Sequence, residues 1–131
     1  MIFTMPISTY AIANDESIST FGQSKPSKSW DWTKGEYTFS GEANTSVLYS
    51  NYSFTDANKL YIYVRNRHAS KTLTVKLLKS QFGVDFSVST IEIKPKNYAE
   101  WSVDVNSSKS YILKFSAPSD FSGKISDEPF D

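Results

Sequence analysis

The chain has 131 residues, with 14 basic and 14 acidic side chains and therefore a formal net charge of zero. A protein that binds nucleic acid through its phosphates is expected to be basic, so this balance argues against nucleic acid as the partner. The sequence has no cysteine, which excludes disulfides and thiolate-ligated metal sites, so one hydrophobic core must hold the fold.

The first 13 residues differ in character from the rest of the chain. They read MIFTMPISTYAIA, carry no charge, are mostly apolar and end in Ala11-Ile12-Ala13. Small residues in this spacing suit a signal peptidase, so we expect residues 1–13 to be a shortened signal peptide of a secreted, bacterial protein. The alternative is a first strand or arm of the mature fold. No run approaches the roughly 18 apolar residues of a transmembrane helix.

Residues 14–35 are predicted to form an irregular leader, because Ser, Pro and Gly interrupt any periodic pattern. This segment contains Trp30 and Trp32. A tryptophan in a surface loop is a common platform for a ligand, which makes both residues candidates for ligand binding. The other interpretation is that they plug one end of the folded domain.

From residue 36 to residue 126 the sequence alternates between apolar and polar residues in short stretches separated by turn residues. This pattern predicts a single all-β domain of about eight short strands, an antiparallel β-sandwich of jelly-roll or immunoglobulin-like type, with a barrel as the alternative. The predicted strands are residues 36–40, 46–54, 59–66, 71–79, 84–94, 98–105, 110–117 and 120–126. Residues 127–131 form a short acidic tail.

Two strand predictions go further. The apolar positions of residues 84–94 change parity near Ser89-Thr90, which predicts a β-bulge there. In the two following strands, alternation places Asp104 and Lys114 on outward faces, where they could lie across a strand pair.

The segment 58–79 is predicted to be a β-hairpin with a polar turn at residues 67–70. From Ala57 to Val84 the chain carries six Lys or Arg, one His and no acidic residue. Exposed tyrosines suit stacking on sugar rings, and clustered cations suit an anionic partner. The alternatives are that the cations protect a sheet edge and that the tyrosines pack beneath the leader. The candidate ligand-binding residues of this hairpin are Tyr61, Tyr63, Arg65, Arg67, His68 and Lys71.

No catalytic residue, cofactor or metal ligand is predicted. His68 lies between cations, with no neighbouring carboxylate to orient it as a base. Glu100 and Asp104 share a strand face, but at roughly 3.3 Å per residue they lie about 13 Å apart, which exceeds glycosidase spacing. No calcium-loop motif occurs, so a structural Ca²⁺ held by loop carboxylates is a minor alternative.

These observations predict a secreted, non-catalytic β-sandwich that binds a cell-surface glycan, an anionic polymer or a protein. One alternative, from the alternating Ser, Thr and Tyr strands and the cationic hairpin, is a membrane-active or toxin-like β-protein. Another is a hydrolase whose carboxylates meet only in the fold. Nothing in the sequence indicates an oligomeric state.

Overall fold

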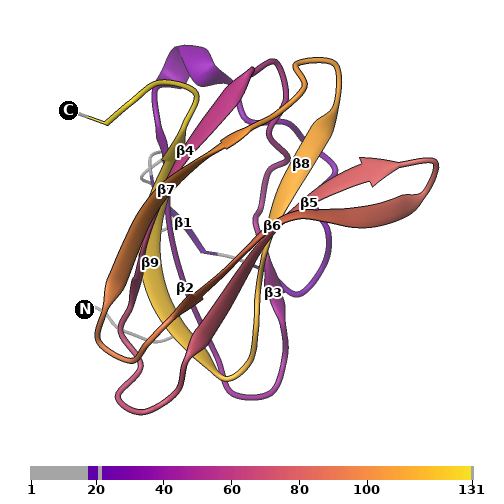
Figure 1. The fold of residues 1–131 in the computed structure, drawn as a ribbon. Coiled ribbons are helices and arrows are strands. Elements are labelled where there is room, and N and C mark those ends of the chain that lie inside the picture. Colours follow the sequence, from indigo (N-terminus) through magenta and orange to yellow (C-terminus); the bar gives the residue numbers. More distant parts are fainter. Residues whose placement is uncertain (1–17, 21, 131) are drawn as a thin grey trace.

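The computed structural model describes residues 18–20 and 22–130, so the predicted signal peptide at residues 1–13 lies outside the described residues. In this part of the chain, nine strands form two stacked sheets, and one short 3-10 helix lies in a connection between strands (Figure 1). The elements are β1 (Ile18–Thr20), η1 (Trp32–Lys34), β2 (Tyr37–Ala43), β3 (Leu48–Tyr49), β4 (Lys59–Asn66), β5 (Leu73–Gln81), β6 (Val84–Ile93), β7 (Tyr98–Asp104), β8 (Ser110–Phe115) and β9 (Ser119–Ser126).

The order of the strands identifies the type of sandwich. The five-stranded sheet has the order β1-β2-β9-β4-β7, and the four-stranded sheet has the order β3-β8-β5-β6. If β2 to β9 are counted from one to eight, the sheets read 1-8-3-6 and 2-7-4-5, which is the order of a jelly roll. The predicted all-β antiparallel sandwich is confirmed. Each of the eight predicted strands corresponds to one of β2 to β9, and β1 adds a parallel edge strand beside β2.

The predicted hairpin at residues 58–79 is wrong. Strand β4 pairs with β7 and β9, whereas β5 pairs with β6 and β8 in the other sheet. Alternation specifies which face of a strand is buried, but a sandwich offers two sheets with buried faces, so it does not select the partner strand. The suggested pairing of Asp104 with Lys114 is wrong for the same reason, because Asp104 lies opposite Lys59 and β8 belongs to the other sheet.

The predicted bulge is present within one residue of its expected place. Leu77 of β5 lies opposite Ser89 of β6, and the next residue, Leu78, lies opposite Ser87. Val88 is therefore the extra residue of the bulge.

Part of the expected leader belongs to the sandwich. Gly22 exchanges two backbone hydrogen bonds with Tyr49 of β3, at 3.1 and 2.7 Å, at one edge of the four-stranded sheet. The Lys25 ammonium then pairs with the Asp85 carboxylate of β6, at the opposite edge. The segment thus crosses the outer side of this sheet, which accounts for the burial of Leu78 and Ile112 at outward-facing strand positions.

Stacked aromatic rings join the two sheets. Phe115 of the four-stranded sheet lies flat on Phe121 of the five-stranded sheet, with ring centroids 3.8 Å apart and an interplanar angle of 7°. Phe39 meets both rings edge-on, at 5.8 and 6.1 Å. Tyr37 and Trp30 continue the column toward one end of the sandwich, and all five side chains are buried.

Gly123 of β9 makes room for this column. A Cβ at this position would lie 2.8 Å from Cζ of Phe39 and closer still to the carbonyl oxygen of Tyr63. Neither backbone nor packed ring can move away cheaply, so only glycine fits here.

We expect Gly123→Ala to lower the free energy of unfolding by about 3 kcal/mol, because the added methyl group overpacks the core. Urea denaturation of the two proteins measures this change. Ser122→Ala, on the neighbouring outward position of the same strand, should change stability by no more than about 0.5 kcal/mol. Equal stability of Gly123→Ala and the wild type would contradict this account of the core.

The buried side chain of Asn66 connects the two sheets where β4 crosses over to β5. Its Nδ2 donates to the carbonyl oxygens of Lys71 and Ile93, at 2.8 and 2.9 Å, and its Oδ1 accepts from the His68 N–H at 3.0 Å. Ile93 ends β6 in the four-stranded sheet, whereas Asn66 ends β4 in the five-stranded sheet. One amide group therefore holds the crossover loop and both sheets.

Asn66→Ala should lower the free energy of unfolding by about 2–4 kcal/mol, since it leaves buried carbonyl groups without donors. Thermal and urea unfolding report the change. Asn106 also caps a loop through its side chain but is exposed, so Asn106→Ala should cost less than about 1 kcal/mol. Similar losses in the two variants would show that Asn66 has no special role.

Candidate functional site

The alternation of β4 creates an outward tyrosine surface on the five-stranded sheet. Leu60, Ile62 and Val64 are fully buried, so the residues between them point to the opposite side. The register places Tyr63 between Glu100 of β7 and Lys124 of β9. We call this surface the tyrosine face, and it comprises Tyr61, Tyr63, Arg65, Tyr98, Glu100 and Lys124.

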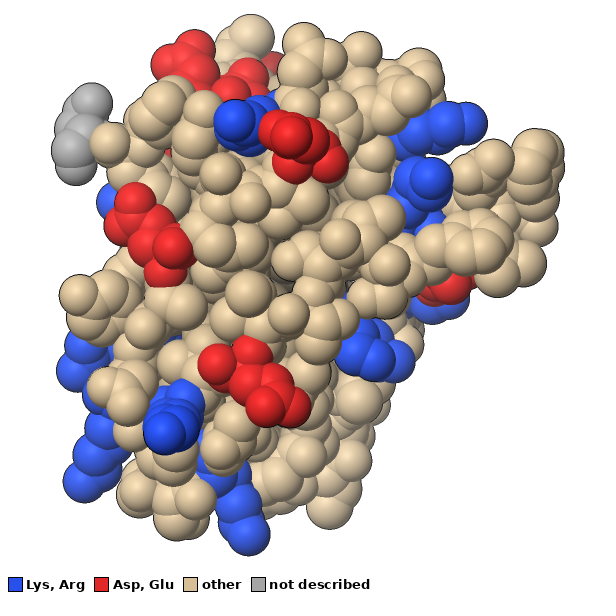
Figure 2. Space-filling view, viewed as in Figure 1, with Lys and Arg blue, Asp and Glu red and all other residues tan. Residues whose placement is uncertain are grey.

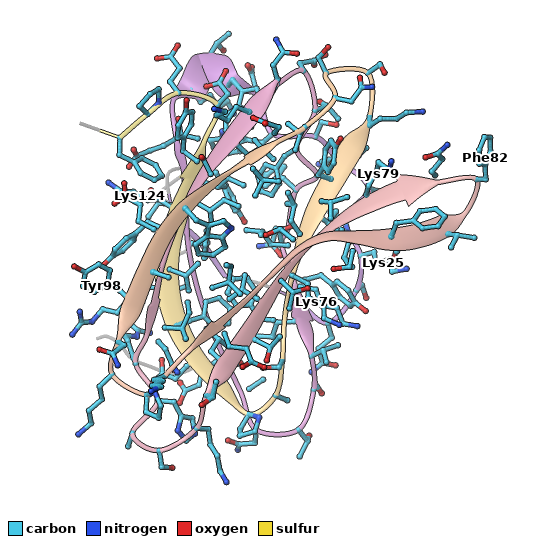
Figure 3. The ribbon with its side chains drawn as sticks, viewed as in Figure 1. Lys25, Lys76, Lys79, Phe82, Tyr98 and Lys124 are labelled. Carbon is cyan, nitrogen blue, oxygen red and sulfur yellow. The ribbon has the colours of Figure 1, made fainter. Side chains whose placement is uncertain are left out.

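Two aromatic rings of the tyrosine face lie side by side. The ring centroids of Tyr63 and Tyr98 are 5.7 Å apart, with the rings tilted by 38°. Tyr98 is 62% exposed, and Tyr63 is half-buried. Tyr98 and Lys124 project from the same side of the molecule (Figure 3). The pair thus offers an aromatic surface to solvent.

The charges around these rings differ in how they are paired. At one end Lys59 lies 3.5 Å from Asp104, and on β9 Lys124 lies 3.9 Å from Glu36. Arg65 is exposed, lies opposite Tyr98, and has no ion pair with any residue in the described part of the chain. In the view of Figure 2, Lys and Arg side chains gather at the lower left of the molecule, and Asp and Glu side chains lie above and beside them. Arg65 is therefore a cation available to a ligand beside an exposed aromatic ring.

The other basic candidates hold the crossover loop. Arg67 places Nε and Nη2 at 3.1 and 2.9 Å from one Asp120 carboxylate oxygen, and its backbone N–H donates to the Asp120 carbonyl at 2.7 Å. Nδ1 of His68 accepts from the backbone N–H groups of Ser70 and Lys71, both at 3.1 Å. These contacts give Arg67 and His68 structural partners, and the Lys71 carbonyl accepts from Asn66.

Trp30 and Trp32 lie at one end of the sandwich, away from the tyrosine face. Trp30 is 5% exposed and donates from Nε1 to the Gly35 carbonyl at 3.0 Å. Trp32 is half-buried, stacks on Phe54 at 5.8 Å and donates to the Thr55 carbonyl at 2.7 Å. These contacts favour the interpretation that both residues plug one end of the sandwich, and not that they form a platform for a ligand.

Tyr98 and Phe82, whose rings are the most exposed in the described part of the chain, were missed by the sequence reasoning. Tyr98 has the same parity as the outward Glu100, so its direction was readable, but its contact with Tyr63 depends on the pairing of β4 with β7. Phe82 lies in the turn between β5 and β6 and is 91% exposed. The adjacent Gly83 is a residue type common in turns, but it does not indicate how far this turn projects.

Two side chains have shifted pKa values, and both lie away from the tyrosine face. Hydrogen bonds from the Thr33 side chain and backbone N–H lower the pKa of Asp31, which caps η1. The hydrogen bond to Asp85 raises the pKa of Lys25. Within residues 18–20 and 22–130, no three His, Asp or Glu side chains gather where they could hold a metal ion.

Comparison of the chain with known protein families, with curated proteins and with solved structures found no significant match. In the described part of the chain, no helix has the length and hydrophobicity needed to cross a bilayer. A jelly-roll order by itself carries no function, because one fold supports unrelated activities. Function is therefore inferred from the side chains of the tyrosine face.

Alanine substitutions at Trp30 and Tyr98 distinguish an aromatic residue of the core from one of the surface by their effect on stability. Trp30→Ala should lower the free energy of unfolding by about 3–5 kcal/mol, because it opens a cavity in the aromatic column. Tyr98→Ala should change it by no more than about 0.5 kcal/mol. Urea denaturation followed by circular dichroism measures both, and a stable Trp30→Ala variant would return Trp30 to the ligand-binding candidates.

Proposed function

We propose that this protein is a secreted, non-catalytic binding domain whose tyrosine face recognises an anionic polysaccharide of a cell surface. The observation that carries the proposal is the exposed Tyr63–Tyr98 pair beside Arg65, a cation with no ion pair among the described residues. Secretion is supported by Ala11 and Ala13, two small residues in the A-x-A spacing that a signal peptidase accepts.

The two tyrosines suit a sugar ring. The flat face of a tyrosine packs against the C–H groups of a pyranose, while its hydroxyl group can hydrogen-bond to the sugar hydroxyls. Ser102 and Ser122 lie on the same outward face, opposite Tyr61 and Arg65. Aromatic surface with hydroxyl groups around it matches a ligand that has both apolar and polar sides.

Arg65 determines the charge expected of the ligand. A guanidinium group binds a carboxylate or phosphate through two parallel hydrogen bonds, which gives direction as well as affinity. Glu100, opposite Tyr63, repels a second anionic group nearby. A polymer whose acidic substituent meets Arg65 while a neutral part covers Tyr63 satisfies both conditions.

A binding role fits this surface better than hydrolysis does. Glu100 and Asp104 lie four residues apart on β7, which is about 13 Å at roughly 3.3 Å per residue and too far for a glycosidase pair. Asp104 is also paired with Lys59. The positions of these two outward carboxylates therefore support binding of a polysaccharide without its hydrolysis.

Affinity electrophoresis in gels containing polygalacturonate, with dextran as the neutral polymer, tests the proposal. Polygalacturonate should retard the wild-type protein more than dextran does, and the effect should weaken with added salt. Tyr98→Ala should weaken binding about tenfold, equivalent to about 1.4 kcal/mol. Arg65→Ala should remove the preference for the anionic polymer.

Lys76→Ala is the matched control, because it removes a cation from the outer side of the other sheet and should leave binding unchanged. Circular dichroism confirms that each variant is folded. Failure of the folded wild type to bind any tested polysaccharide at low salt would refute the proposal. Binding of polygalacturonate by Tyr98→Ala and Arg65→Ala as strong as that of the wild type would refute it too.

A further inference from the structure

Strands β5 and β6 form a hairpin that extends past the end of the sandwich. Their turn is Phe82-Gly83, and β5 remains paired with β8 only as far as Ser80, which lies opposite Ser110. From there to the turn the hairpin has no neighbouring strand on the side of β8 and projects into solvent (Figure 1). The tip is therefore an extension of one sheet without the other sheet to cover it.

The residue at the tip is unusual for its backbone conformation. Phe82 and Gly83 have φ values of 54° and 75°, so both lie in the left-handed region, as a two-residue type I′ turn requires. Asn-Gly is favoured in this turn, and a bulky residue at positive φ is strained. The Phe82 ring is also 91% exposed. Both the strain and the exposure disfavour phenylalanine in the isolated protein, which points to a contact made outside it.

Further apolar side chains extend from this tip along β6. Val84, Phe86 and Val88 are 53%, 48% and 39% exposed. Val84 and Phe86 are two residues apart and therefore point to the same side of the strand. Contiguous exposed apolar side chains of this kind mark interaction sites. We call Phe82, Val84, Phe86 and Val88 the apolar finger.

Lysine side chains surround the base of the apolar finger. Lys79 lies opposite Phe86, and Lys76 lies three residues earlier on β5, on the opposite face of the strand. Asp85 is the acidic residue near the tip, and it is paired with the Lys25 ammonium. Phe82 lies at the end of the hairpin with Lys79, Lys25 and Lys76 toward its base (Figure 3), and the projecting tip itself is free of basic side chains (Figure 2).

We propose that the apolar finger docks the protein onto an anionic lipid bilayer. Phe82 enters the interface between headgroups and acyl chains, where aromatic and aliphatic side chains are stabilised. Lys76 and Lys79 remain at the level of the headgroups and attract anionic lipid. This docking is independent of polysaccharide binding, because the tyrosine face lies on the other sheet.

A lipid surface fits the apolar finger better than a second copy of the chain does. Pairing of two β6 edges would be interrupted by the bulge at Val88 and would leave Phe82, beyond the strand, uncovered. An anionic bilayer covers the tip and complements the lysines at once.

Co-sedimentation of the full chain with vesicles tests the proposal, using phosphatidylcholine alone and phosphatidylcholine mixed with phosphatidylserine. The protein should bind the mixed vesicles and lose binding as salt is raised. Phe82→Asn should reduce binding about tenfold or more, because it removes the inserted ring. The same change creates an Asn-Gly turn, so the melting temperature should stay equal or rise. Loss of binding is then not a loss of folding.

Two further variants separate the sources of affinity. Lys76→Gln combined with Lys79→Gln should remove the preference for phosphatidylserine. Tyr98→Ala, which removes an exposed aromatic ring from the tyrosine face, should leave vesicle binding unchanged, while Phe82→Asn should leave binding to polygalacturonate unchanged. The two proposed sites can therefore fail separately.

Three results would overturn the lipid proposal. The first is no binding of the wild type to mixed vesicles at low salt, and the second is equal binding by Phe82→Asn. The third is concentration-dependent dimerisation in analytical ultracentrifugation that Phe82→Asn abolishes, without vesicle binding. That last result would assign the apolar finger to a second copy of the chain.

Discussion

The contact between Phe115 and Phe121 is the interaction on which the remaining structure depends. It joins the two sheets through rings 3.8 Å apart, and Phe39 closes the contact from the side. The Phe39 ring fits because glycine at position 123 leaves space for it on β9, beside β4. The position of β9 in turn sets the register of β4, and thereby the outward side on which Tyr63 and Arg65 lie.

The tyrosine face and the apolar finger both arise from alternation along a strand, and they differ in whether the opposite sheet covers the inward side of that strand. On β4 every second residue meets the opposite sheet and is buried, so the intervening residues form the outer surface. On β6 the alternation continues beyond the sandwich, where no opposite sheet remains to cover it. Apolar residues that would be core elsewhere, such as Val84 and Phe86, are therefore exposed.

The two surfaces are placed so that they can act at the same time. Tyr98 lies on one side of the molecule and Phe82 at the far end of the opposite hairpin (Figure 3). They belong to different sheets, and the rigid core connects them. A domain that docks through Phe82 would thus present its tyrosine face away from the lipid, toward polymer at the cell surface.

Alternation in the sequence determined the fold class, the eight strands of the jelly roll and the inward or outward direction of residues such as Tyr61, Tyr63 and Arg65, because these depend only on local period and burial. Tertiary structure alone decided that β4 and β5 belong to different sheets, that Tyr98 meets Tyr63, and that Arg67 is held by Asp120. These contacts join residues distant in sequence, and many pairings are compatible with one buried face. The exposure of Phe82 was likewise decided by where β8 begins, which no pattern within residues 71–94 records.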